Sequence, residues 1–271
     1  MIPDRLARHG YNLPMATLHD VLTLLRLLAP EESALDDDPV GLLIAPSLAR
    51  DITRIGVCLD ATLPVVTRAF AMGADLVIAH HPLIYNPLKR IAPATDGVSA
   101  SVAALIKADI ALYAMHTNWD RAHGGINDTL ARLLALHDAE PLGTDGASSL
   151  PRVGDLALAQ PLGEFCAFIA KTLGCAGTSA LRVNSVDPNR LVKRVAVCGG
   201  AGAFLMRDAI AAGADAYVTA DVRHHEFIEA DARGIALIDA GHGATERPGM
   251  RELALLLPER LPGVGVEWLE E

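Results

Sequence analysis

The stretch RIGVCLDATLPVVTRAFAMGADLVIAHH, residues 54–81, decides the fold because the chain repeats it 140 residues further on. The second copy is RVAVCGGAGAFLMRDAIAAGADAYVTAD, residues 194–221, and it aligns with the first without a gap. Each copy reads as a strand, a loop, a helix and a second strand, and Gly73 or Gly213 stands where a helix end requires left-handed backbone. Each copy is therefore predicted to be a βαβ unit with parallel strands. The identical pairs are Arg54/Arg194, Val57/Val197, Cys58/Cys198, Ala61/Ala201, Ala69/Ala209, Ala71/Ala211, Gly73/Gly213, Ala74/Ala214 and Asp75/Asp215.

The repeat predicts an α/β fold of two lobes built from a duplicated βαβ unit, with the second lobe inserted into the first. Residues 1–138 and 236–271 are expected to form a metal-binding lobe, and residues 139–235 the inserted lobe. The return at residue 236 is expected because the C-terminal segment carries candidate ligands that must meet those of the first half. Apolar periodicity predicts helices over Thr17–Ala29 and Pro161–Leu173, and a helix over Met250–Leu257 that begins after Pro248.

Composition and charge exclude several classes of protein. With 271 residues the chain has room for one or two domains, and a hydrophobic fraction of 51% excludes intrinsic disorder. The net charge of −10 argues against nucleic acid or an anionic membrane as the main partner. No apolar run approaches the roughly 18 residues of a membrane span, and the N-terminus lacks the pattern of a secretory signal. We therefore expect a cytoplasmic protein with no nucleic-acid partner and no membrane partner.

Two adjacent histidines, His80 and His81, follow the apolar strand Leu76–Ala79 and precede Pro82. Neighbouring side chains on a strand point to opposite faces, but where Pro82 forces a turn the two imidazoles can diverge around one cavity. That geometry suits two neighbouring metal ions better than chelation of one. The carboxyl ends of parallel strands are also where open α/β sheets place their sites. The alternative is a pair of surface histidines that cap the strand.

Both halves of the chain end a strand in the pattern His-x-x-x-carboxylate: His116 with Asp120, and His242 with Glu246. Asp120 offers a hard oxygen donor, and the two oxygens of Glu246 could bridge a pair of ions. The alternative for Glu246 is a carboxylate favoured by a helix N-terminus. His116 could be a ligand, a neighbour that contacts a ligand or substrate, or a structural histidine.

Together these patterns nominate five metal ligands, with three nitrogen and two oxygen donors. Mixed imidazole and carboxylate ligands suit Zn, Mn, Fe or Co rather than Ca. Two such ions about 3.5–4 Å apart would bind a shared water and orient a substrate for hydrolysis. We therefore expect two divalent metal ions as cofactors. The candidate ligands are His80, His81, Asp120, His242 and Glu246.

Other residues are candidates for the substrate side of the site. Arg223, His224 and His225 belong to the segment Asp221–Glu226, which occupies the place in the second copy that His80 and His81 occupy in the first. They either line the cleft or are a relic of the metal pair. In the first case Arg223 and His224, with His116, would bind substrate, and His225 would be a catalytic proton donor or acceptor.

Two loops complete the set of candidates. His123, close to Asp120 in the sequence, is a second candidate catalytic residue, as a proton shuttle. The loop Gly199–Gly202 could hold a phosphate at the start of the following helix, or it could simply be a tight turn.

Several of these motifs resemble the GTP cyclohydrolase 1 type 2 family, also described as Ngg-interacting-factor-three-like dinuclear metal proteins. The resemblance extends from about residue 17 to residue 265, and the family's metal ligands correspond to the same five residues. It further implies two α/β lobes and a toroidal homohexamer whose metal sites face an inner cavity. The matching segments are AHHPLIY (79–85), HTNWD with GGIND (116–128), VAVCGGAGAF (195–204), TADVRHHE (219–226) and DAGHGATE (239–246).

The chain departs from the family pattern in two places, and neither is a candidate ligand. Asp38-Pro39-Val40-Gly41-Leu42 stands where the family commonly has Asp-Asn-x-Gly-Leu, and Gly243 stands where an aromatic residue often follows Gly-His. Both differences could alter the fit of a substrate.

The resemblance implies a metal-dependent hydrolase that opens the imidazole ring of GTP and releases formate. Its substrate would be a small, nucleotide-like molecule attacked by metal-activated water. Two alternatives stay open from the sequence. One is a phosphohydrolase that acts on another nucleotide, and the other is a non-enzymatic metal-binding or regulatory ring protein.

Overall fold

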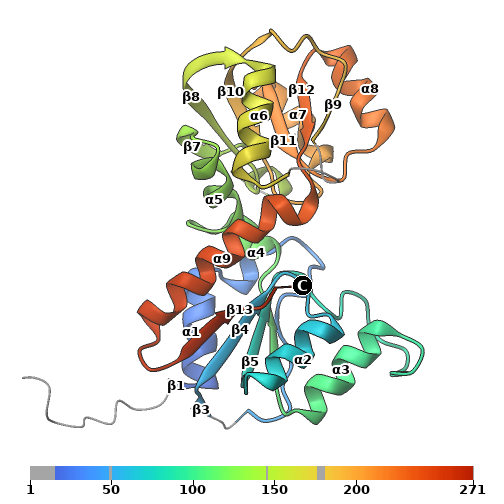
Figure 1. The fold of residues 1–271 in the computed structure, drawn as a ribbon, viewed down its shortest axis with the longest axis vertical. Helices are drawn as coiled ribbons and strands as arrows, with labels where there is room; N and C mark the ends of the chain where they lie inside the picture. The colour runs from blue at the N-terminus through green and yellow to red at the C-terminus, as the bar shows by residue number, and fades with distance from the viewer. Residues whose placement is uncertain (1–15, 49–50, 145, 176–180, 271) are drawn as a thin grey trace, which may run out of the picture.

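The computed structural model describes residues 16–48, 51–144, 146–175 and 181–270. These residues form two α/β lobes that lie end to end, and a long C-terminal helix runs from their junction along the first lobe (Figure 1). The first lobe contains a five-stranded sheet in the order β13-β4-β5-β6-β2, and the second a six-stranded sheet in the order β7-β8-β10-β11-β12-β9. The predicted α/β class with two lobes is therefore confirmed.

The first sheet is parallel except for β2, which runs antiparallel to β6. Its strands are β2 (Gly41–Ile44), β4 (Arg54–Cys58), β5 (Leu76–Ala79), β6 (Ala111–Ala114) and β13 (Gly265–Trp268). The short strands β1 (Ala16–Thr17) and β3 (Asp51–Ile52) pair separately. The accompanying helices are α1 (Leu18–Leu28), η1 (Glu31–Ser33), α2 (Leu63–Ala71), α3 (Gly97–Lys107), α4 (Thr117–Arg121) and α9 (His242–Arg260).

Helices cover both faces of the first sheet, so its central strands β4, β5 and β6 are buried on both sides. One face packs on α1 and α9, through residues such as Val21, Leu25 and Leu253. The other packs on α2 and α3, through residues such as Val65 and Leu105. Burial on both faces explains the continuous apolar runs of the sequence.

The second lobe contains the second copy of the repeat and a long antiparallel arm. Its strands are β7 (His137–Pro141), β8 (Arg152–Pro161), β9 (Arg182–Val183), β10 (Leu191–Val197), β11 (Ala216–Thr219) and β12 (Ala236–Asp239). Its helices are α5 (Ile126–Leu133), η2 (Gly146–Ser149), α6 (Leu162–Thr172), η3 (Ala203–Leu205), α7 (Met206–Ala211) and α8 (His224–Arg233).

The two copies of the repeat adopt the same strand register. Ile55 lies opposite Leu76 in the first lobe, and Val195 lies opposite Ala216 in the second, so each pair keeps its place in the repeat. The shared aspartate also plays the same part in both copies. The Asp75 carboxylate accepts from the backbone amides of residues 53 and 54, and the Asp215 carboxylate accepts from those of residues 193 and 194.

The predicted limits of the inserted lobe need correction at both ends. Leu130 of α5 and Leu134, directly after this helix, are already buried in the core of the second lobe, so the chain leaves the first lobe before residue 138. The predicted return at residue 236 is too early, because β12 pairs with β11 and β9 inside the second sheet. The chain returns through α9 instead. Strand β12 belongs to the second lobe because it pairs with β11 and β9 there. The candidate ligands His242 and Glu246 follow only after this strand, in α9.

The helix boundaries follow the sequence except at α9. The predicted start of α1 is confirmed, since Thr17 caps it in a capping box with Asp20. Helix α9, however, begins at His242 and contains Pro248, whereas the sequence predicts a helix that starts after this proline. One proline removes one backbone hydrogen bond, and the buried side chains of Met250, Leu253 and Leu257 hold the helix in place.

Candidate metal centre

Five side chains converge where the first sheet ends and the second lobe begins. His80 and His81 directly follow β5, and Asp120 lies in the short helix α4 that follows β6. His242 and Glu246 occupy the first turns of α9, which enters from β12 of the second lobe. Both halves of the chain are therefore needed to bring the set together.

The Glu246 carboxylate lies at the middle of this cluster. Its Oε1 is 3.1 Å from His242 Nε2 and 3.5 Å from His80 Nε2. Its Oε2 is 3.2 Å from His81 Nε2. Asp120 Oδ1 lies 3.6 Å from His80 Nε2, and the Nε2 atoms of His81 and His242 are 3.2 Å apart. The two oxygens of Glu246 thus face different imidazoles, which is the arrangement that a bridging carboxylate requires.

The two His-x-x-x-carboxylate patterns are helical pairs. His242 and Glu246 are separated by one helical turn in α9, so their side chains lie on the same face. His116 is the N-cap of α4, and the Asp120 amide donates to its carbonyl at 3.0 Å. The recurring spacing therefore reflects helix geometry at two strand ends.

Three donor atoms of the cluster are buried and without a hydrogen-bond partner among the described residues. They are His80 Nε2, Asp120 Oδ1 and Glu246 Oε2. Buried polar atoms are nearly always paired, so an unpaired group calls for an explanation such as a bound ion. All three are donor types that Zn, Mn, Fe or Co accept. The residues present therefore fit a divalent metal.

The remaining nitrogen of each clustered imidazole is held by an oxygen outside the cluster. His80 Nδ1 donates to the carbonyl of Met115 at 2.8 Å. His81 Nδ1 lies 2.9 Å from Asp60 Oδ1, and His242 Nδ1 lies 2.7 Å from Asp221 Oδ2. Such contacts fix the ring orientation of metal-binding histidines and raise their basicity.

Sequence reasoning did not find the supporting carboxylates Asp60 and Asp221. A signal was present, because both residues follow strands of the repeat: Asp60 lies just after β4, and Asp221 stands where the first copy has His81.

His116 lies beside the cluster and is oriented by Asp38. Its Nδ1 is 2.8 Å from Asp38 Oδ1, and its ring centroid is 5.2 Å from that of His80 and 5.8 Å from that of His81. One nitrogen each of His80, His81 and His116 lie within 4.8 Å of one another. The same holds for one ligand atom each of His81, His242 and Glu246. Two overlapping groups of donors therefore share His81.

The clustered groups alter one another's protonation. Burial lowers the pKa of His81, but the carboxylates of Asp60 and Glu246 outweigh it and raise this pKa to about 10. The hydrogen bond to Glu246 raises the pKa of His242 to about 9. Burial raises the pKa of Asp120 to about 6. Burial also acts to raise the pKa of Glu246, but the surrounding imidazoles hold it well below its usual range. Bound cations must therefore displace protons from imidazoles.

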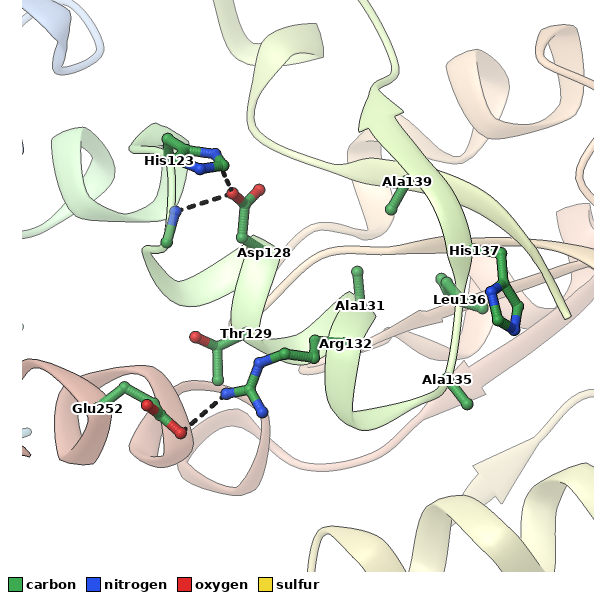
Figure 2. Close-up of a pocket in the computed structure, with 11 residues that line it drawn as sticks. His123, Asp128, Thr129, Ala131, Arg132, Ala135, Leu136, His137, Ala139 and Glu252 are labelled. Carbon is green, nitrogen blue, oxygen red and sulfur yellow. Dashed lines mark hydrogen bonds and ion pairs between the residues drawn. The ribbon is translucent and has the colours of Figure 1, made fainter.

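His123, the candidate proton shuttle, is not brought to this cluster. Its side chain is exposed, and its Nδ1 lies 3.0 Å from Asp128 Oδ2. Figure 2 shows His123 facing Asp128 at one side of a pocket where Arg132 meets Glu252. This pocket has a volume of about 550 Å³, and its lining includes none of the five candidate ligands.

Arg223, His224 and His225 lie on the second lobe, where α8 begins. Arg223 is the N-cap of that helix, and both histidines are exposed. Arg223 and Asp221 line a small cavity of about 110 Å³. The segment is therefore linked to the cluster through Asp221, the residue that holds His242.

Three amides of the glycine loop are already used in hydrogen bonds within the protein. The amide of Gly199 donates to Asn127 Oδ1 at 2.7 Å, and that of Gly200 donates to Thr245 Oγ1 at 3.0 Å. The amide of Gly202 donates to a threonine hydroxyl at 2.9 Å. The loop is a tight turn packed against the cluster, which is the second of the two interpretations offered by the sequence.

The described residues contain no helix with both the length and the apolar character needed to cross a membrane.

Residues 16–270 match the family model Duf34/NIF3 (NGG1p interacting factor 3). A GTP cyclohydrolase 1 type 2 homolog from Streptomyces coelicolor is 39% identical over 240 residues, covering 86% of this chain and 83% of that protein. One from Nostoc sp. is 36% identical over 231 residues, covering 85% of each chain.

Solved structures agree with these matches. The crystal structure of a hypothetical protein from Staphylococcus aureus has a TM-score of 0.84 and 27% identity to this chain, and covers 94% of this chain and 96% of that one. The resemblance stated from the motifs is therefore confirmed. With a family model matched from residue 16 to residue 270 and relatives above 30% identity, the chain belongs to the DUF34/NIF3 family.

Proposed function

We propose that the chain is a metal-dependent hydrolase with a dinuclear centre that acts on a small, nucleotide-like substrate. The ligands of its two divalent ions, Zn, Mn, Fe or Co, would be His80, His81, Asp120, His242 and Glu246. The observation that carries the proposal is the trio of buried, unpaired donor atoms on His80, Asp120 and Glu246. Buried polar atoms are rarely left without a hydrogen-bond partner, and bound cations would satisfy all three.

The chain's own residues would prepare the site. The two oxygens of Glu246, each facing a different imidazole, would hold the ions side by side. Asp60 and Asp221 would keep the rings of His81 and His242 in the orientation that points Nε2 inward. When bound, such ions acidify a shared water and stabilise negative charge on the substrate.

We place substrate contacts at the rim formed by both lobes. Arg223 and His224 would bind an anionic group of the substrate, because Arg223 lines the same small cavity as Asp221 and His224 follows it as the first residue of α8. His116 would contact substrate from the first lobe, and His225 would exchange protons. We do not extend the proposal to His123, because it pairs with Asp128 in a separate pocket.

The substrate class rests on the relatives. Proteins of Streptomyces coelicolor and Nostoc sp. that resemble this chain are named GTP cyclohydrolase 1 type 2 homolog. We therefore propose GTP as the first substrate to test, with ring opening and formate release as the reaction. We also propose a cytoplasmic homohexamer. A monomer found by light scattering would contradict the hexamer.

The decisive experiment is elemental analysis of protein purified with and without oxygen, followed by assays over a nucleotide panel that includes GTP. Two ions per chain and formate release that Asp120→Ala abolishes would support the proposal. Release of phosphate instead would assign a phosphohydrolase. Tightly bound ions without turnover of any nucleotide would indicate a metal-binding or regulatory ring. Protein without metal, together with a Glu246→Gln variant that binds added metal as well as wild type, would overturn the centre itself.

A further inference from the structure

The second copy of the repeat touches the candidate centre at two positions that supply no proposed ligand. With the offset of 140, Gly200 corresponds to Asp60, and Asp221 corresponds to His81. In the first copy these two positions form the hydrogen-bonded pair His81–Asp60. In the second copy both face residues of α9 instead. The same two strand ends of the duplicated unit therefore approach the cluster from opposite lobes.

Gly200 lies directly against the ligating end of Glu246. A Cβ atom at this position would be 2.2 Å from Glu246 Oε1 and 3.3 Å from His242 Nε2. Real Cβ atoms do not approach another atom so closely, so any side chain at position 200 must push the carboxylate away. The atom that would move is Oε1, the oxygen that faces His80 and His242. Glycine here therefore sets the place of one metal-binding oxygen.

The backbone of Gly200 has little room to retreat. Its amide donates to Thr245 Oγ1 at 3.0 Å. Its carbonyl accepts from the amide of Ala220 at 2.9 Å and from Thr219 Oγ1 at 3.0 Å. Its φ of +62° is a left-handed conformation that glycine adopts without strain. The loop is thus tied to α9 on one side and to the end of β11 on the other.

Asp221 acts on the other ligand of α9. Its Oδ2 lies 2.7 Å from His242 Nδ1, which leaves Nε2 of that ring directed at Glu246 and His81. Asp221 is itself left-handed, with a φ of +53°. This conformation, uncommon outside glycine and asparagine or aspartate, turns the carboxylate toward α9 directly after the strand ends.

We propose that Gly200 and Asp221 are positioning residues: the second copy of the repeat has become the support that holds Glu246 and His242 in their metal-binding geometry. The proposal rests on the function proposed above, since it presupposes ions at the centre. It assigns a role to the second lobe, which contributes a wall and an orienting carboxylate.

The test compares two glycines that share backbone strain but differ in surroundings. Gly200→Ala and Gly213→Ala both place alanine at positive φ, at +62° and +76°, but a Cβ at residue 213 meets nothing within 4 Å. Chelator-stripped variants are titrated with Co²⁺, and affinity, stoichiometry and the visible absorption spectrum are recorded beside the melting temperature without metal. We expect both variants to melt lower than wild type. Only Gly200→Ala should lose at least about tenfold in Co²⁺ affinity and change the spectrum.

A second pair of variants keeps the test valid if Gly200→Ala fails to fold. Asp221→Asn tolerates the left-handed backbone but removes the charge from His242, and we expect about 10- to 100-fold weaker Co²⁺ binding. Asp215→Asn is its control and should bind Co²⁺ as wild type does, because the Asp215 carboxylate accepts from the backbone amides of residues 193 and 194 within the second lobe.

The outcomes separate this inference from the function on which it rests. Wild-type protein that takes up no ion overturns the proposed function, and the inference falls with it. Wild-type protein that binds Co²⁺, with Gly200→Ala and Asp221→Asn that bind it equally tightly and with the same spectrum, overturns the positioning role alone.

Discussion

Asn127 accepts a 2.7 Å hydrogen bond from the backbone amide of Gly199, and its own amide donates to the carbonyl of Asp120 at 3.2 Å. One buried side chain thereby joins α4 of the first lobe to the glycine loop of the second. Asp120 is a candidate ligand, and Gly199 belongs to the glycine loop that packs against the cluster. The relative position of the two lobes and the geometry of the cluster therefore depend on the same residue, Asn127.

Replacing Asn127 by alanine should destabilise the protein. The substitution leaves the Gly199 amide and the Asp120 carbonyl without their partner, and a buried unpaired group costs about 1–3 kcal/mol. Urea denaturation of stripped protein measures the change. A matched substitution on the surface of the same helix, Arg132→Ala, should cost well under 1 kcal/mol, because its ion pair with Glu252 is exposed. Equal losses for both variants would contradict the bridging role of Asn127.

Replacing Asp60 by asparagine should weaken metal binding without unfolding the chain. Asp60 orients His81 through Nδ1, and loss of such a partner typically lowers metal affinity about 10- to 100-fold. Competition with a coloured chelator gives the affinity of each variant. Asp75→Asn, in the same repeat copy but hydrogen-bonded to backbone amides of residues 53 and 54, is the control. Unchanged metal affinity in Asp60→Asn would show that the contact between Asp60 and His81 does not affect metal binding.

The stripped and loaded proteins should respond oppositely to pH. The pKa of His81 is raised to about 10 and that of His242 to about 9, against 6.5 for each in the unfolded chain. Between pH 6.5 and these values the folded, stripped chain binds more protons than the unfolded one, so its stability is full below pH 6.5 and falls as pH rises. Ions compete with the same protons, so metal affinity should rise over this interval.

Thermal melts from pH 6 to pH 10, with and without saturating Zn²⁺, measure both trends. Calorimetry in buffers of different ionisation enthalpy measures the number of protons released when Zn²⁺ binds. This number tests whether the ions displace protons from the imidazoles. The metal-free protein would contradict the raised pKa values if its melting temperature rose between pH 6.5 and pH 9. The His81→Ala variant is the control, because the same change of melting temperature with pH in this variant would show that His81 does not cause it.

Thr17 should stabilise the start of the first lobe. Its hydroxyl accepts from the Asp20 amide at 3.2 Å, and the Asp20 carboxylate accepts from the Thr17 amide at 2.9 Å. Loss of an N-cap of this type costs about 0.5–2 kcal/mol, so Thr17→Ala should lower stability by that amount and leave metal affinity unchanged. Chemical denaturation measures the first and Co²⁺ titration the second. Thr17→Ser, which keeps the hydroxyl, should restore most of the loss.

The parts of the structure that sequence reasoning predicted are those set by local rules. A repeated strand–helix–strand pattern predicted the two parallel units, and polar residues at strand ends predicted where His80, His81 and Asp120 lie. The sequence shows the spacing of His242 and Glu246 but not its helical origin, because a proline such as Pro248 usually precedes a helix rather than lying within it. The helix tolerates that proline because tertiary packing of its later turns outweighs one lost hydrogen bond.

Long-range pairing accounts for the rest. The repeat places Asp60 and Asp221 just after strands, but only the folded chain shows which imidazole nitrogen each one meets. His123 is close to Asp120 along the chain, yet α4 and the following turn carry it to another pocket. The sequence predicts that the chain returns to the first lobe at β12, whereas β12 lies between β11 and β9 in the second sheet. Both partner strands precede β12 in the sequence, so the pairing with β9 is not visible from the order of the strands.

The place of α9 in chain order has a consequence for biosynthesis. His80, His81 and Asp120 are made early, whereas His242 and Glu246 belong to a helix that starts only at residue 242. A growing chain on the ribosome thus has three of the five donors and lacks the carboxylate at the middle of the cluster. The proposed centre can be completed only after residue 246 has been made, so metal capture would report that both lobes have been made and folded together.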